Sequence, residues 1–447
     1  MSYPARIHVG ITCPPAIGHL NPMMALGQEL KQRGHRVTFL QVLDFENPIR
    51  ASGCDFYAIA PSDYPPGTSA NFFANLRNLR EPAATRYWFE EQQRVAAIFC
   101  RDLPVAIQNL GIDALIVDQN EPAGATVAEY LGLPFVSVSN GLMMQREPDI
   151  PPVFTLWSYE KTQWARLRNR MVHGCVNALS RPYSQVLAAY RRKWKLPPLP
   201  QGEILYANSK LAQISQQPSV FDFPRSQLPR HFHYVGPLRS PHPQPYSQIC
   251  SFPFSQLTKQ PLIYASLGSL MQNQQVFTCI AAACEGLKAQ LVLTHGGSLS
   301  DKEAAALPGS PLTVSYAPQR ELLARATLTI THAGLNTVLD SLTYGVPMVA
   351  VPIAFEQPGI AARIRWTGVG EVIPGDRLSV RGLRSAIQQV LTLRSYGQKA
   401  LLAKAAIAAS GGVTRAADIV EQAIWTGEPV INQSIFNQQT ISLESVG

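Results

Sequence analysis

Residues 329–340 read TITHAGLNTVLD, in which a short apolar strand passes through a turn of small residues into a helix. The first N–H groups of a helix are unpaired and carry the positive end of its dipole, so such a turn favours a bound anion, typically phosphate. Within it lies Gly334, and His332, Asn336 and Thr337 add side-chain donors. One helical turn further on, the carboxylate of Asp340 is placed to accept ribose hydroxyls. The stretch predicts a nucleotide site where a strand meets a helix.

The alternation of strand and helix continues outward from this stretch. Short apolar runs at residues 262–266, 291–294, 312–315 and 347–351 are separated by helical patterns. In the first half of the chain, β-rich runs at 6–12, 36–42, 112–118 and 134–139 flank helices predicted at 22–32 and 122–131. Asn21 is the predicted N-cap of the earlier helix, with Pro22 as its first residue. Such repeated units predict parallel sheets with helices on both faces.

Seven prolines and glycines crowd residues 236–261, a span that can sustain neither a helix nor a central strand. We therefore predict an α/β chain of two Rossmann-like, doubly wound domains. The first covers residues 1–236 and binds an acceptor, a linker covers 237–260, the second covers 261–427 and binds a nucleotide, and 428–447 form a tail. Ligands of such sheets bind beyond the carboxyl ends of the strands, so the two domains are expected to face a cleft.

Composition limits the classes of partner. The net charge is +8, and the lysines and arginines are not interleaved with aromatic residues as in nucleic-acid-binding proteins, so no nucleic-acid partner is expected. The seven cysteines are scattered without metal-ligand spacing, which favours free thiols in the cytoplasm. We expect no signal peptide, because residues 1–10 lack a basic segment followed by an apolar core. No apolar run is long enough to span a bilayer, so any membrane contact is expected to be peripheral. Basic clusters at 166–170 and 191–195 suit an anionic inner membrane face.

His19 and Asp118 are the candidate catalytic pair. His19 lies in IGHLNP at residues 17–22, where the first strand turns into a helix, and Asp118 ends a predicted strand of the same half. Imidazole titrates near neutral pH and suits a general base, and a carboxylate can orient the ring and stabilise the imidazolium. The alternative is that the histidine is incidental to a helix-capping turn. In the same way, His332 could be a histidine of the core.

The flanks of the opening stretch complete a longer pattern over residues 316–357. Tyr316-Ala-Pro-Gln319 precedes the strand, and Gly345-Val-Pro347 and Glu356-Gln357 follow the helix. The whole resembles the donor-binding signature of glycosyltransferase family 1, the UDP-glycosyltransferases, which runs W-x-P-Q, H-x-G-x-N-S/T-x-x-E, G-V-P and D/E-Q. The resemblance implies a GT-B fold and transfer of a sugar from a UDP-sugar.

The resemblance assigns roles position by position. It places Tyr316 and Gln319 at the base, Asp340 at the ribose, and Glu356 and Gln357 at the sugar hydroxyls. For binding of the diphosphate it indicates His332, Gly334, Asn336 and Thr337, a second loop with Gly268 and Ser269, and Gly18. The catalytic pair of the family matches His19 and Asp118. The chain departs from the pattern where Tyr316 and Leu335 replace tryptophans and Asp340 replaces glutamate.

These roles imply one in-line displacement with inversion. His19 takes the acceptor proton, and UDP leaves against the helix end near His332. Because the chain has no DxD motif, we expect neither a metal ion nor another cofactor.

The choice of acceptor rests on a wider resemblance to the bacterial zeaxanthin glucosyltransferases. It covers residues 117–125, 133–138, 146–148, 211–216, 235–239, 333–340 and 355–359. It implies glucose transfer from UDP-glucose to a xanthophyll, and hence an apolar small-molecule acceptor. Several apolar side chains could line its pocket or belong to the core: Phe72, Phe73, Trp88, Met143, Met144 and Trp157.

Three alternatives stay open at this point. The same chemistry could serve soluble aglycones such as flavonoids or macrolides, a related two-domain fold could epimerise a UDP-sugar, or the chain could bind a UDP-sugar without catalysis. A nicotinamide oxidoreductase is disfavoured because no GxGxxG follows either opening strand.

Overall fold

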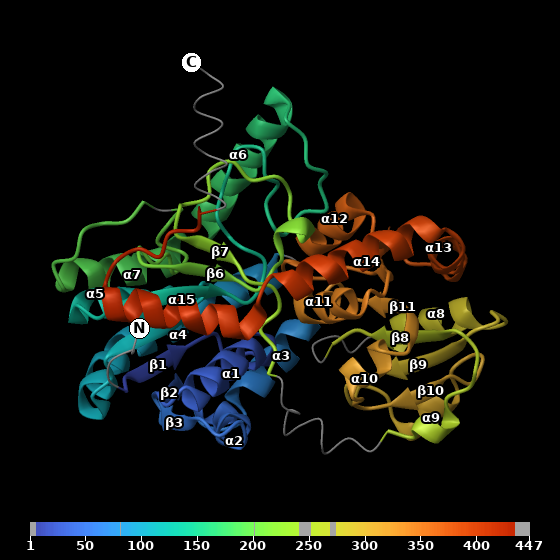
Figure 1. Cartoon of the computed structure of the whole chain (residues 1–447), viewed down its shortest axis with the longest axis horizontal. Helices are drawn as coiled ribbons and strands as arrows, with labels where there is room; N and C mark the ends of the chain where they lie inside the picture. Colours follow the sequence, from blue (N-terminus) through green and yellow to red (C-terminus); the bar gives the residue numbers. More distant parts are fainter. Residues whose placement is uncertain (1–5, 81, 201, 241–251, 269–273, 434–447) are drawn as a thin grey trace.

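The computed structural model describes residues 6–80, 82–200, 202–240, 252–268 and 274–433. They form two α/β domains, each built on a parallel sheet (Figure 1). The first sheet has the strand order β3-β2-β1-β4-β5-β6-β7. Its strands are β1 (His8–Thr12), β2 (Arg36–Gln41), β3 (Asp55–Ala58), β4 (Ala114–Asp118), β5 (Phe135–Ser139), β6 (Gln213–Ser215) and β7 (Phe232–Tyr234).

The second sheet repeats the same winding in the order β10-β9-β8-β11-β12-β13. Its strands are β8 (Leu262–Ser266), β9 (Gln290–Thr294), β10 (Leu312–Val314), β11 (Ala326–Thr331), β12 (Met348–Ala350) and β13 (Gly370–Val372). In both sheets the chain starts in the middle, builds one edge and then returns to build the other. This is the doubly wound order, and it confirms the predicted α/β class with two Rossmann-like domains.

Helices cover both faces of the first sheet. Its strands and α1 (Ile17–Gln32) share one core with α15 (Gly412–Thr426), and a second core lies under α4 (Ala83–Leu110), α5 (Pro122–Leu131) and α7 (Arg181–Lys193). The remaining helices of this half are α2 (Glu46–Ala51), α3 (Thr68–Asn78) and α6 (Gln163–Leu179). In Figure 1, α6 projects well beyond both sheets.

The second sheet is also sandwiched. On one face lie α8 (Gln274–Cys284) and α13 (Val380–Thr392), and on the other α11 (Leu335–Tyr344), α12 (Gln357–Thr367) and α14 (Arg394–Ala409). Two shorter helices, α9 (Asp301–Ala305) and α10 (Gln319–Leu323), lie near β10. None of the helices among the described residues is both long and apolar enough to cross a bilayer.

The end of the chain returns to the first domain. Val413, Ile419 and Val420 of α15 are buried in the core that contains β1 and α1. The predicted domain ranges stay a prediction, but this packing argues that residues 412–430 belong with the first domain and not with residues 261–411. Parts of the predicted linker and tail, 241–251 and 434–447, lie outside the described residues.

The predicted start of the first long helix was wrong. We expected Asn21 as its N-cap, but α1 begins at Ile17 with Ala16 as the N-cap, so Pro22 lies inside the helix. His19 therefore sits in the first helical turn. The proline is tolerated so near the start because few intrahelical bonds are lost there.

A buried ion cluster joins the two domains. Arg363 of α12 donates from Nε to Asp222 Oδ1 at 2.7 Å, and Arg225 donates from Nε to Asp222 Oδ2 at 3.0 Å. All three side chains are almost fully buried. Burial alone would raise the pKa of Asp222, but the two guanidinium groups outweigh it and hold that pKa well below its usual range.

The cluster predicts a large stability effect from one substitution. Asp222→Asn removes the charge partner of Arg363 and the nearer of the two carboxylates beside Arg225, the other being Glu147 at 3.9 Å. Breaking a buried pair typically costs about 3–5 kcal/mol. We expect a clearly lower Tm at neutral pH, measured by thermal unfolding. Asp63→Asn is the matched control, because Asp63 pairs with Arg101 at the surface and such pairs contribute only about 0–1 kcal/mol. Equal Tm values for the two variants would contradict this view of the interface.

Because the folded-state pKa of Asp222 lies below its unfolded value of about 3.9, the contribution of Asp222 is present above that value. It is lost as the pH falls through the lower, folded-state pKa. The difference in Tm between wild type and Asp222→Asn should therefore shrink as the pH is lowered below about 4.

Candidate active site

Two strand ends of the first sheet place His19 and Asp118 in contact. His19 follows β1, Asp118 ends β4, and these strands are neighbours. His19 Nδ1 and Asp118 Oδ2 are 2.8 Å apart, with Asp118 fully buried and the His19 side chain 21% exposed. A carboxylate only accepts hydrogen bonds, so Nδ1 carries the proton and Nε2 is left as the basic nitrogen. The predicted pair thus has the geometry of a base and its orienting carboxylate.

Further donors fix the Asp118 carboxylate. Asn140 Nδ2 donates to the same Oδ2 at 2.6 Å, and the Asn120 backbone N–H donates to Oδ1 at 2.8 Å. Sequence reasoning missed Asn140, although it directly follows β5, the next strand of the sheet. Its place just beyond that strand's carboxyl end was the available signal.

The pKa of His19 reflects opposing effects. Burial works to lower it, but the charge of Asp118 and the hydrogen bond to it outweigh burial and raise the pKa above its ordinary value. The carboxylate of Glu356, from the second domain, adds to the rise. The two carboxylates therefore stabilise the protonated form of His19.

The predicted phosphate turn lies between β11 and α11. Ala333 has φ +66°, a left-handed conformation that a non-glycine residue adopts at a cost and that is often found at functional sites. Glycines enclose the His332 ring, because a Cβ would lie 2.8 Å from it at Gly268 and 2.5 Å at Gly334. Ser269, predicted for the same loop, lies outside the described residues.

His332 differs from His19 in charge. The His332 ring is partly buried, and burial lowers its pKa to about 4, so the imidazole is neutral near pH 7. A neutral ring can still donate one hydrogen bond to a phosphate oxygen, but it brings no positive charge.

A hydrogen bond between the domains joins the start of α1 to the start of α11. Asn336 Nδ2 of α11 donates to the Gly18 carbonyl oxygen at 2.8 Å. Inside α1 this carbonyl would normally accept from the residue four positions on, which is Pro22, and proline has no N–H. The proline thus frees the carbonyl beside His19 for the second domain.

Asp340 is held by a residue that sequence reasoning left without a role, Arg239. Arg239 Nε donates to Asp340 Oδ1 at 2.6 Å, and Gln319 Nε2 donates to Oδ2 at 2.7 Å. Thr337 Oγ1 lies 3.5 Å from Gln319 Oε1, and Tyr316, close by along the chain, is exposed. Gln319, predicted for the base, and Asp340, predicted for the ribose, therefore meet between the start of α10 and the first turns of α11.

Arg239 also continues toward the catalytic pair. Its Nη1 donates to Gln216 Oε1 at 3.0 Å and its Nη2 to Asn336 Oδ1 at 3.1 Å. Gln216 Nε2 donates in turn to the Asn140 carbonyl oxygen. A chain of polar contacts thus runs from the Asp340 carboxylate to the asparagine that binds Asp118.

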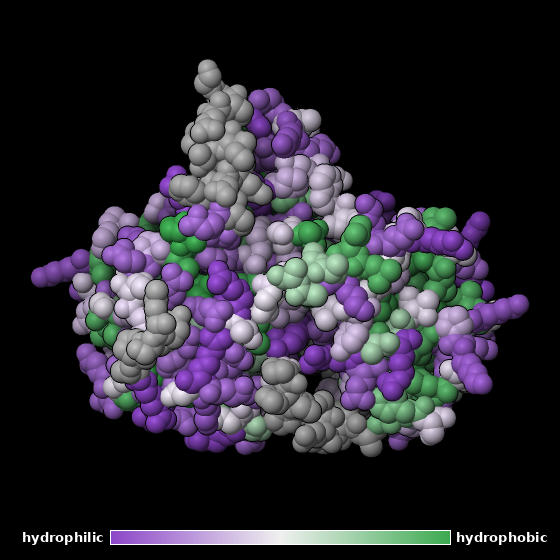
Figure 2. Space-filling view, viewed as in Figure 1, coloured by the Kyte–Doolittle hydropathy of each residue, from purple (hydrophilic) through white to green (hydrophobic). Residues whose placement is uncertain are grey.

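Glu356 and Gln357 behave differently from each other. Glu356 lies across from the first domain, where a Cβ on Gly141 would be 3.5 Å from its Oε1, and it is close enough to influence His19. Gln357 Oε1 accepts from the backbone N–H groups of Ile353 and Ala354, both at 2.9 Å. The buried Gln357 side chain therefore shapes its own loop, and only its amide nitrogen is left for a ligand. Figure 2 shows a hollow between the domains bordered mainly by hydrophilic residues.

Aromatic residues from both domains form one cluster. Phe72 of α3 lies 5.2 Å from Phe73 and from Tyr87 and 5.9 Å from Trp88, as measured between ring centroids. Trp88 lies 5.0 Å from Phe355, the residue before Glu356. By contrast, Met143 is buried in the core, Met144 packs against an interdomain core, and Trp157 stacks with Arg168.

Among the described residues, no three His, Cys, Asp or Glu side chains are grouped so as to hold a metal ion. The predicted independence of metal stays a prediction.

Comparisons with known proteins agree with this geometry. The family model of UDP-glucoronosyl and UDP-glucosyl transferase matches residues 11–405. The zeaxanthin glucosyltransferase of Pantoea ananas is 37% identical, over 96% of this chain and 98% of that protein. The zeaxanthin glucosyltransferase of Pseudescherichia vulneris is 36% identical, over 95% and 99%.

Among solved structures, the glycotransferase of kitacinnamycin matches with a TM-score of 0.73 at 21% identity, over 94% of this chain and 99% of that one. The fold is therefore GT-B, as predicted. Together with the two sheets and the match across most of the chain, this shows that the protein is a glycosyltransferase enzyme of the UDP-glucoronosyl and UDP-glucosyl transferase family.

Proposed function

We propose that this enzyme transfers glucose from UDP-glucose to a hydroxyl of an apolar acceptor, a xanthophyll such as zeaxanthin, with inversion and without a metal ion. The observation that carries the proposal is the His19–Asp118 pair, which lies at the carboxyl ends of β1 and β4. A hydrogen bond from Asn336 of α11 to Gly18 connects this pair to the second domain. The two zeaxanthin glucosyltransferases that align over nearly the whole chain support the choice of sugar and acceptor.

The reaction is a single displacement. His19 Nε2 accepts the proton of the acceptor hydroxyl, whose oxygen forms a bond to the anomeric carbon as the bond to the diphosphate breaks. Asp118 keeps the ring in the required tautomer and stabilises the imidazolium. Because attack and departure occur on opposite sides of the carbon, an α-linked donor gives a β-glycoside.

The leaving diphosphate meets the start of α11. The unpaired N–H groups there carry about half a positive charge, and neutral His332 donates one further hydrogen bond. The exposed ring of Tyr316 stacks on the base. Arg239 holds the Asp340 carboxylate in place, and ribose hydroxyls take over the carboxylate oxygen that Gln319 otherwise occupies.

The acceptor lies against the cluster of Phe72, Phe73, Tyr87, Trp88 and Phe355. Aromatic side chains offer a large apolar contact area, which suits a long hydrocarbon with a hydroxyl at its end. A molecule this apolar partitions into lipid, so the proposed enzyme would meet it at a membrane surface.

One prediction of this mechanism concerns the general base. His19→Gln should lower kcat by at least about a thousandfold, the upper range for a general base, while UDP affinity measured by calorimetry stays unchanged. His231→Gln, a histidine outside the cleft, is the matched control. Wild-type turnover in His19→Gln would remove His19 from the mechanism.

The pH profile tests the role of Asp118. The base must be unprotonated, so kcat/KM falls as the pH drops through the raised pKa of His19. In Asp118→Asn the burial that lowers this pKa remains and the charge that raises it is lost. The acidic limb should therefore move to lower pH while the maximal rate falls. An acidic limb that does not move would show that Asp118 does not act through His19.

Metal dependence is tested directly. Because the helix end and hydrogen bonds receive the diphosphate, turnover in excess EDTA should equal turnover in Mg²⁺. A strict requirement for a divalent ion would overturn the metal-free mechanism while leaving the His19 result in place.

The acceptor prediction compares zeaxanthin, a flavonol and a macrolide with UDP-glucose, with products identified by mass. We expect zeaxanthin glucosides. Trp88→Ala should raise the acceptor KM by about tenfold or more, since burying one large apolar side chain contributes roughly 1.5–3 kcal/mol, and should leave the donor KM unchanged. Glycosylation of the flavonol alone would overturn the carotenoid proposal.

A further inference from the structure

The projecting helix α6 presents an apolar face to solvent. Trp164, Leu167 and Met171 are 66%, 47% and 60% exposed, and their spacing of three and four residues puts them on one side of the helix. On the opposite side Ala165 and Asn169 are buried. Amphipathic helices of globular proteins normally turn their apolar face inward. The exposed residues Trp164, Leu167 and Met171 are called the α6 stripe below.

The charge of the chain is concentrated at the same place. Residues 161–202, which include α6 and α7, contain nine lysines and arginines and no aspartate or glutamate. Since the whole chain carries +8, the remainder is close to neutral. Arg166 and Arg191 pair with Asp149 and Glu129, respectively. Arg170 and Arg181 are exposed and form no ion pair within the part of the chain that the structure describes.

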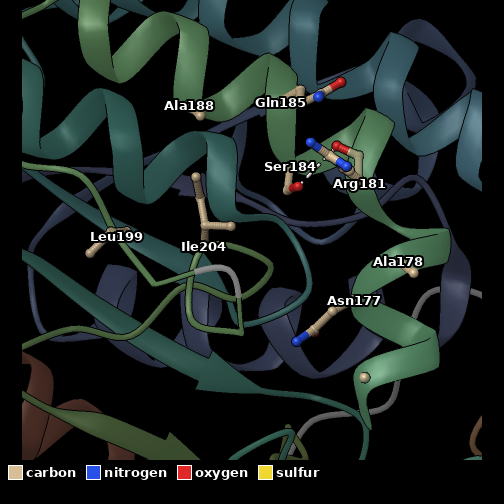
Figure 3. A pocket seen from close by; sticks show the side chains of 9 residues that line it. Asn177, Ala178, Arg181, Ser184, Gln185, Ala188, Leu199 and Ile204 are labelled. Atoms are coloured by element: carbon tan, nitrogen blue, oxygen red, sulfur yellow. Dashed lines mark hydrogen bonds between the residues drawn. The ribbon is translucent and has the colours of Figure 1, made fainter. Parts of the chain in front are cut away.

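A groove of about 640 Å³ lies between α6, α7 and the loop that follows α7. Figure 3 shows Leu199 and Ile204 of that loop on one side of the groove, and Asn177 and Ala178 of α6 on the other. The groove thus has a mixed polar and apolar lining that includes Arg181, which has no ion-pair partner among the described residues.

We propose that the α6–α7 hairpin docks the enzyme on the surface of an anionic phospholipid bilayer. Trp164, Leu167 and Met171 enter the boundary between headgroups and acyl chains, where tryptophan is favoured. Arg170 and Arg181 contact lipid phosphates, with the other basic residues of 161–202 adding longer-range attraction. The docking goes beyond the sugar-transfer chemistry and does not depend on it.

The charge argues against the other occupants of this face. A second copy of the chain would bring two identical, purely basic segments together, and like charges repel. A nucleic acid would use the arginines but would leave the leucine and methionine of the α6 stripe uncovered. An anionic bilayer satisfies both the charge and the apolar side chains.

The experiment is cosedimentation of the full chain with vesicles. Phosphatidylcholine vesicles that contain phosphatidylglycerol should bind the wild type, and vesicles of phosphatidylcholine alone should bind it far more weakly. The binding should weaken as salt is raised, because screening removes the attraction of exposed charges. Equal binding to both vesicle types would overturn the proposal.

Two double variants separate the contributions. Arg170→Gln with Arg181→Gln should weaken binding to anionic vesicles by about twentyfold, since each basic residue near the surface contributes about fivefold. Trp164→Ser with Met171→Ser should weaken it by about tenfold or more. The matched controls are Arg381→Gln on α13 and Leu401→Ser with Leu402→Ser on α14, side chains that are also exposed. The controls should bind as the wild type does.

Turnover with a detergent-dispersed acceptor shows whether a variant has lost catalysis as well as membrane binding. It should be unchanged in all these variants, because none of the residues lies in the cleft. Wild-type vesicle binding by both double variants would overturn the proposal. A second result would also overturn it. Light scattering would show that the wild type is a dimer and that the Trp164→Ser, Met171→Ser variant is a monomer, while vesicle binding is unchanged. If neither the wild type nor any variant transferred sugar, that would contradict the proposed function and would leave the vesicle result valid.

Discussion

The missing N–H of Pro22 determines how the two halves of this enzyme meet. An ordinary residue at position 22 would donate its backbone N–H to the Gly18 carbonyl oxygen. With proline there, that oxygen accepts from Asn336 at 2.8 Å, at the N-terminal end of α11. The turn that carries the base is thereby fixed to the helix end predicted to receive the diphosphate. Gln216, Arg239 and Asn140 extend the connection to the carboxylates on either side.

The two histidines of the cleft show how one physical effect can serve two purposes. Burial lowers the pKa of both rings. At His332 it prevails and takes the pKa to about 4, so the ring is a neutral hydrogen-bond donor. At His19 the Asp118 carboxylate, 2.8 Å away, outweighs it and favours the protonated form. In the proposed reaction, this effect would favour the proton on His19 after its removal from the acceptor.

Sequence reasoning found what depends on strand order and missed what depends on contacts between distant segments. Asp118 was found because parallel strands present their last residues at one edge, and α5 was found because Pro122 and Gly132 mark its ends. The three-residue strands β6 and β7 are too short to show a period of two, and the predicted Asn21 N-cap failed because a proline preference was given too much weight. Arg239 lies in a proline-rich stretch that looked like a plain linker. Only the folded chain brings it within 2.6 Å of Asp340.

The aromatic cluster links the choice of acceptor to the donor loop. Phe355 has φ +56°, an unfavourable conformation for a phenylalanine, and this directs its ring toward Trp88 of the other domain at 5.0 Å. The next residue is Glu356, whose charge influences His19, so the residues proposed for the acceptor wall and for the sugar contact are adjacent in one segment. Gln357 holds that segment by accepting two backbone hydrogen bonds. In the proposed reaction, the loop that contacts the sugar would therefore also contact the acceptor, and both domains would contribute to the acceptor site.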